Sequence, residues 1–444
     1  MANRLFTVAA ALVVTPMVFL GAGIAVRAGE APVPSPTAGA VRGGAPGLEM
    51  ATARDLRSSV QNQQDRLRRL PEDAAGWSGL AVSYLQLARV DGDPSYYARA
   101  ERALERSLEL SPDSNADALA GQAALASARH EFALARDLAA RATVLDPYDA
   151  TTQGILGDAL IELGDYDAGF AAIQRMVDLK PGVPSYTRVS YSYELRGDLD
   201  GARFGLDSAL SVAVSPVHRA FVLYHLGELA FNAGDPEGAR AHFARGLAGD
   251  PGDVRLLAGR ARVAAALGEA EEALKDYAAV VRRVPDPTVV VEYGELLESL
   301  GRVDEAQEQY AVADAARALA AAAGVVPDVE IALYDADHGR PVDALATALA
   351  QYQTRRSVHV EDAMAWALHA NGRDAEALEH AYAAQRVGIR SALFAYHRGM
   401  IETALGRDDA ARASLAEALA INPYFSPRHV PIATAKLAQL GGPA

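Results

Sequence analysis

A helix-breaking signal returns along this chain about every 34 residues, and it limits the possible folds more than any other feature. Glycine permits the positive φ at which many helices end, and proline is tolerated in the first turn of the next helix. Both recur in step, which predicts helix–turn–helix units placed one after another. The turn positions are Gly164, Gly197, Gly234, Gly268, Gly301, Gly339, Gly372 and Gly406, with His130 in the same slot one unit earlier; the boundary prolines are Pro112, Pro147, Pro181, Pro216, Pro251 and Pro285.

Small and large side chains alternate with the same period around each turn. Seven residues before Gly234 stands the small residue Gly227, and five residues after it stands Ala239. Small residues at facing positions let two antiparallel helices approach closely. A large residue four positions further on, Phe243 in this unit and Tyr310 two units later, is expected to fill the space beside them.

These units resemble the tetratricopeptide repeat. The segment WSGLAVSY gives the family's pattern on the first helix as Trp77, Leu80–Ala81 and Tyr84, and LYHLGELA gives part of it again. Ten frames begin near residues 74, 116, 150, 183, 220, 254, 287, 325, 358 and 392. The resemblance implies an all-α, right-handed α-solenoid over residues 74–424, whose first helices line a concave face that binds a protein or peptide partner.

Both ends of the array carry segments that we expect to cap it. Residues 50–73 are predicted to form an N-terminal capping helix, and residues 425–444 a C-terminal capping helix and tail. Solenoids need such caps because their end units would otherwise expose apolar surface. Contacts limited to neighbouring units would also make unfolding broad or dependent on the probe.

The first 49 residues differ in composition from the array. Residues 1–28 combine Arg4, an uncharged apolar run and a small residue at Ala28, a pattern typical of a cleaved export signal. The run is also long enough to be an uncleaved N-terminal membrane anchor. Residues 29–49 contain four prolines and five glycines and are expected to be a linker. The sequence therefore predicts an exported protein, at the cell envelope or outside the cell, that would touch a membrane only through an uncleaved first segment.

Charge and residue types exclude several classes of function. The net charge of -15 argues against nucleic acid as a partner, because phosphate binding needs a basic surface. The chain has no cysteine, which removes disulfides and thiolate metal sites. No nucleophile elbow, phosphate loop or HExxH motif occurs, so we expect neither enzyme activity nor a cofactor.

The family's geometry places concave residues at positions 2, 5, 9 and 12 of each first helix. Several of these are aromatic or charged, and such residues often anchor interfaces. The alternative is that the superhelix closes and the rings pack across it. The predicted partner-binding residues are Tyr191, Phe221, Tyr224, Glu228, Phe231, Arg255, Arg262, Trp366 and Tyr396, and the same positions give Glu295, Glu298 and Met400.

A second hypothesis is a small-ligand or metal-binding envelope protein. His359, His369, His380 and His397 fall in the ninth and tenth units, where an imidazole cluster could form. The segment YDADHGR offers oxygen ligands, but its glycine is explained by the repeat turn and no glutamate follows at the spacing of a calcium loop.

Overall fold

The computed structural model describes residues 53–322, 325–326 and 328–442, and these ranges contain 22 α-helices and no strand. The predicted export segment (1–28) and linker (29–49) lie outside them. None of the helices in these ranges combines the length and apolar character needed to cross a membrane. The helices are α1 (Ala53–Arg69), α2 (Ala74–Asp91), α3 (Ser95–Leu110), α4 (Ala116–Ala128), α5 (Phe132–Leu145), α6 (Ala150–Glu162), α7 (Tyr166–Leu179), α8 (Val183–Leu195), α9 (Leu199–Val212), α10 (Pro216–Asn232), α11 (Pro236–Gly249), α12 (Val254–Ala266), α13 (Ala270–Arg283), α14 (Pro287–Ser299), α15 (Val303–Ala322), α16 (Val329–Asp337), α17 (Pro341–Thr354), α18 (Val358–Ala370), α19 (Asp374–Ala383), α20 (Ala392–Ala404), α21 (Asp408–Ile421) and α22 (His429–Gln439).

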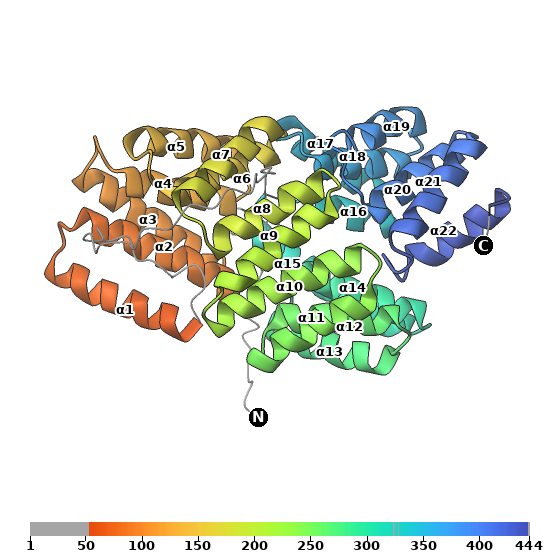
Figure 1. The fold of residues 1–444 in the computed structure, drawn as a ribbon, viewed down its shortest axis with the longest axis horizontal. Coiled ribbons are helices and arrows are strands. Elements are labelled where there is room, and N and C mark those ends of the chain that lie inside the picture. Colours follow the sequence, from red (N-terminus) through yellow and green to blue (C-terminus); the bar gives the residue numbers. More distant parts are fainter. Residues whose placement is uncertain (1–52, 323–324, 327, 443–444) are drawn as a thin grey trace, which may run out of the picture.

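Ten antiparallel pairs, from α2/α3 to α20/α21, form the predicted array, with α1 and α22 at its two ends (Figure 1). The all-α solenoid prediction is therefore confirmed. Eight of the ten first helices start at the residue that opens the predicted frame. The fifth starts one turn early, at Pro216, and the eighth starts late, at Val329, and has only nine residues.

The turns have the backbone that the glycine pattern predicts. All eight turn glycines have positive φ, between 68° and 86°. His130 has φ 63° and is the only non-glycine residue with positive φ in the described ranges. A side chain in this conformation costs about 1–2 kcal/mol, so His130 must be held by its surroundings.

Small residues bring the paired helices together as expected. Phe243 of α11 is fully buried. A methyl group added at Gly227 on α10, or at Gly259 on α12, would collide with its ring. A methyl group added at Gly294 on α14 would likewise collide with the ring of Tyr310 on α15.

The array does not rely on neighbouring units alone. The third to fifth units (α6–α11, the first row) lie beside the eighth to tenth units (α16–α21, the second row; Figure 1). Three turn glycines of the first row fit against three loops of the second, with no room for a side chain between them. The contacts join Gly164 to Arg356, Gly197 to Gly388, and Gly234 to the segment 421–423.

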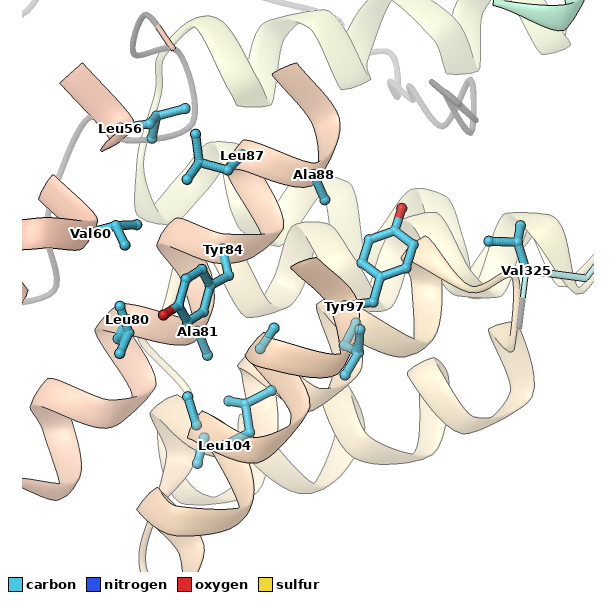
Figure 2. Packing of buried hydrophobic residues seen from close by; sticks show 14 of the residues in the cluster. Leu56, Val60, Leu80, Ala81, Tyr84, Leu87, Ala88, Tyr97, Leu104 and Val325 are labelled. Carbon is cyan, nitrogen blue, oxygen red and sulfur yellow. The ribbon is translucent and has the colours of Figure 1, made fainter. Parts of the chain in front are cut away.

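The long helix α15 connects the rows and also returns to the start of the array. Ala316 and Ala320 of α15 belong to the same buried cluster as Tyr97 and Leu104 of the first unit. Figure 2 shows this cluster, with Leu56 of α1 at one end and Val325, which follows α15, at the other. The prediction of nearest-neighbour contacts was therefore incomplete, because residues more than 200 positions apart share one core.

Candidate functional site

A cavity of about 450 Å³ lies on the concave side of the solenoid and is called the central cavity below. The first helices α6, α8, α10 and α12 and the start of α14 form one side of it. The end of α15 and the start of α16 form the opposite side. The cavity is thus enclosed because the second part of the array folds back over the first.

Five of the nine predicted partner-binding residues line the central cavity. They are Phe221, Tyr224 and Glu228 of α10 and Arg255 and Arg262 of α12. Residues three, four and seven apart share one helix face, and this face of α10 borders the cavity, where Tyr224 also lies beside Phe243 of α11. The predicted positions on the fifth and sixth first helices therefore meet in one place.

Arg255 contacts the two aromatic rings, Phe221 and Tyr224, in the wall of the cavity. Its guanidinium carbon lies 5.5 Å from the ring centre of Phe221 and 5.7 Å from that of Tyr224, within range of a cation–π interaction. Asp253 caps α12 and holds the same guanidinium at 2.8 Å. His225 contacts both rings edge-on, and burial lowers the pKa of its imidazole to about 3, so it is neutral.

Arg262 bridges two carboxylates. Its guanidinium donates to Glu228 at 2.6 Å and to Glu292 of α14 at 2.8 Å. The other carboxylate oxygen of Glu228, Oε1, is buried and has no hydrogen-bond partner in the described part of the chain. A buried acceptor without a partner is costly, so this oxygen is suited to receive a donor from a ligand.

The other four predicted residues lie elsewhere, largely packed within the protein. Phe231 is 3% exposed, and Arg262 lies over its ring at 5.8 Å. Tyr191 reaches across to the second row, where its hydroxyl lies 2.8 Å from Nε2 of His359. Trp366 and Tyr396 belong to one buried cluster with Leu415 and Leu437. Packing across the superhelix, the stated alternative, thus describes Tyr191, whereas Phe231, Trp366 and Tyr396 pack within their own and neighbouring units.

The remaining positions from the same pattern have separate environments. Glu298 pairs with Arg428 at 2.8 Å, and Met400 packs against the Trp366 cluster. Glu295 lines a second cavity that adjoins the first.

The histidines of the ninth and tenth units each face a different partner. His397 contacts Asp362 at 2.9 Å, His380 contacts Glu361 at 2.7 Å, and His369 contacts Asp374 at 2.5 Å. His359 contacts Tyr191. Within the described ranges no three His, Asp or Glu side chains converge where they could hold a metal ion.

Arg355 ties the two rows together and was not predicted from the sequence. Its side chain is almost completely buried, pairs with Glu162 of α6 and with Asp328, and lies 5.0 Å from the ring centre of Phe132. Asp328 also lies 3.2 Å from Nδ1 of His130. No repeat pattern marks Arg355, because it follows the end of α17.

Comparison with known families decides the identity of the repeats. Three family models, each described as the tetratricopeptide repeat, match residues 121–184, 230–290 and 394–425. The chain is a tetratricopeptide repeat protein. The matched stretches run from α4 to the start of α8, from the end of α10 to the start of α14, and over α20 and α21. No curated protein matches this repeat protein in sequence.

The chain is similar to several solved structures. A tetratricopeptide repeat protein from Parabacteroides merdae is 19% identical, covers 59% of this chain and 99% of its own, and has a TM-score of 0.34. A thermophilic tetratricopeptide repeat protein from Thermus thermophilus is 22% identical over 46% of this chain and 98% of its own, with a TM-score of 0.37. Yeast Tom70 is 12% identical over 87% of this chain and 96% of its own, with a TM-score of 0.37.

Proposed function

We propose that this repeat protein is a non-enzymatic adaptor whose central cavity binds an extended peptide segment of a partner protein. The observation that carries the proposal is the convergence of Phe221 and Tyr224 on one cavity with Arg255 between them. Aromatic and arginine side chains are the groups that most often anchor interfaces. The unpaired Oε1 of Glu228 adds an acceptor that a peptide N–H could satisfy.

Photo-crosslinking tests this proposal without knowledge of the partner. Tyr224 is replaced by p-benzoylphenylalanine, and the protein is irradiated in cells of the organism that makes it. Phe204, which is 67% exposed on α9 and outside the cavity, is replaced in the same way as a control. We expect a crosslinked peptide of another protein at position 224 and not at position 204. Crosslinking at neither position, or equally at both, would contradict the proposal.

We also propose that the protein is exported, on the basis of the apolar run in residues 1–28. Deletion of these residues should retain the protein in the cytoplasm. N-terminal sequencing of the exported form separates the two versions of the proposal: a start at Gly29 indicates cleavage, and a start at Met1 or Ala2 indicates an anchor. Export of the truncated chain would contradict both versions.

A further inference from the structure

A second cavity of about 240 Å³ continues from the central cavity and is called the acidic cavity below. It lies between α14, α15, α16 and α20 and the segment that precedes α22. The two cavities share Pro287, Thr288, Arg317, Glu330 and Ile331 in their walls. A chain bound in the central cavity can therefore extend a side chain into the acidic cavity.

The walls of the acidic cavity carry an excess of carboxylates. Among the described residues that line it, Arg317 is the only arginine or lysine, and it already pairs with Asp335 at 2.9 Å. Two of the carboxylates have cationic partners of their own: Glu292 pairs with Arg262, and Asp314 with Arg340. The lining carboxylates in the described ranges are Glu292, Glu295, Asp314, Glu330 and Asp337.

Glu295 and Glu330 are the unpaired members of this set. Neither forms an ion pair, or a side-chain hydrogen bond with another residue, in the part of the chain that the structure describes; Glu295 is half-buried, and Glu330 is exposed where the two cavities meet. A charge on the half-buried carboxyl of Glu295 is expensive, because the protein replaces the water that would solvate it, and this burial raises the pKa of the carboxyl to about 8. A bound cation would remove that cost.

A buried imidazole gives a second and independent indication of a ligand. His429 lines the acidic cavity and is only 5% exposed. Its Nε2 lies 3.3 Å from Oδ1 of Asp337, whereas its Nδ1 has no partner in the described ranges. Buried side-chain nitrogens are rarely left without a partner, so a group that fills the cavity is expected to contact it.

Apolar side chains form much of the remaining wall. Ile331, Leu333, Leu393 and Phe425 surround the charged groups. Lysine and arginine side chains combine an aliphatic stem with a charged end, so they match apolar walls with carboxylates between them. The ring of Phe425 could also face a cation.

We propose that the acidic cavity receives a lysine or arginine side chain of the peptide bound in the central cavity. This inference rests on the proposed function, since it assigns the chemical class of the partner at the adjoining site. Glu295 and Glu330 would pair with the ammonium or guanidinium group, and the aliphatic stem would lie against Ile331 and Leu393. The recognised partner is therefore a basic peptide segment, which also suits the net charge of -15.

The probe is a random dodecapeptide phage library selected on the full chain. Peptides that bind the natural protein but not the Tyr224→Ala protein are kept. Each is synthesised twice, once with arginine at its basic position and once with citrulline, the neutral isostere of arginine. We expect the selected peptides to share a basic residue, and citrulline to weaken binding at least tenfold. The double variant Glu295→Gln/Glu330→Gln should bind both forms about equally. Glu237→Gln/Glu271→Gln, which removes two exposed carboxylates, should behave like the natural protein.

Each other outcome has a definite meaning. Tyr224-dependent peptides without a basic residue would overturn the cation assignment and leave the adaptor function standing. Agmatine, tested alone by calorimetry, distinguishes a free amine from a peptide: if it binds through Glu295 and Glu330 while no peptide is selected, both peptide proposals are overturned. Binding of neither probe would overturn both as well. Since Gln has the shape of a protonated Glu, the double variant should fold, which a melting curve checks.

Discussion

The backbone N–H of Val358 donates a 2.7 Å hydrogen bond to the phenolic oxygen of Tyr166, which lies 192 residues earlier in the chain. Val358 is the first residue of α18, so its N–H has no acceptor within its own helix. Tyr166 begins α7 and is itself buried. The start of a helix in the second row is thus capped by a side chain of the first row.

Tyr166→Phe should therefore destabilise the protein although it removes only one oxygen atom. Leaving the buried N–H of Val358 without a partner costs about 1–3 kcal/mol. Urea unfolding followed by circular dichroism measures the loss. Tyr148→Phe is the matched control, because Tyr148 is 76% exposed and its substitution should change the free energy of unfolding by less than about 0.5 kcal/mol. Equal effects of the two substitutions would contradict the capping role.

Arg355→Met should destabilise the protein more strongly. The substitution keeps much of the contact with Phe132 but leaves Glu162 and Asp328 without their cationic partner. Removing one member of a buried ion pair costs about 3–5 kcal/mol. Arg106→Met removes an exposed pair on a single helix and should cost less than about 1 kcal/mol. A loss for Arg355→Met no larger than this control would show that the rows do not depend on the buried pairs.

Phe231→Ala and Tyr224→Ala should separate folding from binding. Phe231 is in the core, so its truncation should cost about 3–5 kcal/mol of stability. Tyr224 is half-buried at the cavity wall, so its truncation should cost clearly less while abolishing selection of peptides. Thermal melting and the phage selection measure the two effects. A Tyr224→Ala protein that is as unstable as Phe231→Ala would show that Tyr224 is a core residue.

Glu295 should make stability depend on pH. Burial, first of all, and the nearby carboxylate of Asp337 raise the pKa of its carboxyl to about 8, against an ordinary value of 4.5, while Arg428 opposes the shift. The folded protein therefore holds this proton more tightly than the unfolded chain. The resulting stability is complete below pH 4.5 and is lost as the pH rises through 8.

Glu295→Gln removes that dependence and tests it. The variant should melt about 2 °C higher than the natural protein at pH 9 and at about the same temperature at pH 5. Glu271→Gln, at an exposed position on α13, should leave the difference between the two pH values unchanged. A constant difference between Glu295→Gln and the natural protein from pH 5 to pH 9 would contradict the assignment.

The period of the sequence was enough to predict the helix pairs but not the contacts between the two rows. Gly164 and Gly234 mark turns because the backbone there needs positive φ, a local requirement that any sequence pattern can carry. Their contacts with Arg356 and with the segment 421–423 depend on the curvature added up over several units. No residue near Arg356 shows in advance that a turn from the third unit will meet it.

The same distinction applies to the candidate site. Phe221, Tyr224, Glu228, Arg255 and Arg262 could be predicted because position on a first helix decides which face they occupy. Glu330 was not predicted because the first helix of the eighth unit is short and fits the repeat pattern poorly. His429 lies outside the array altogether, and it reaches the acidic cavity only because the C-terminal segment folds against α16 and α20.

The matched contacts between the two rows also bear on how such a gene can change. A simple solenoid can gain or lose a unit by duplication or deletion, because every remaining unit still meets a neighbour of the same kind. Here the turns at Gly164, Gly197 and Gly234 each have their own loop to face. Loss of one unit from either row would leave a loop without its turn and shift every later pair out of step. Unequal recombination, the usual source of variation in repeat genes, should therefore be strongly selected against in this one.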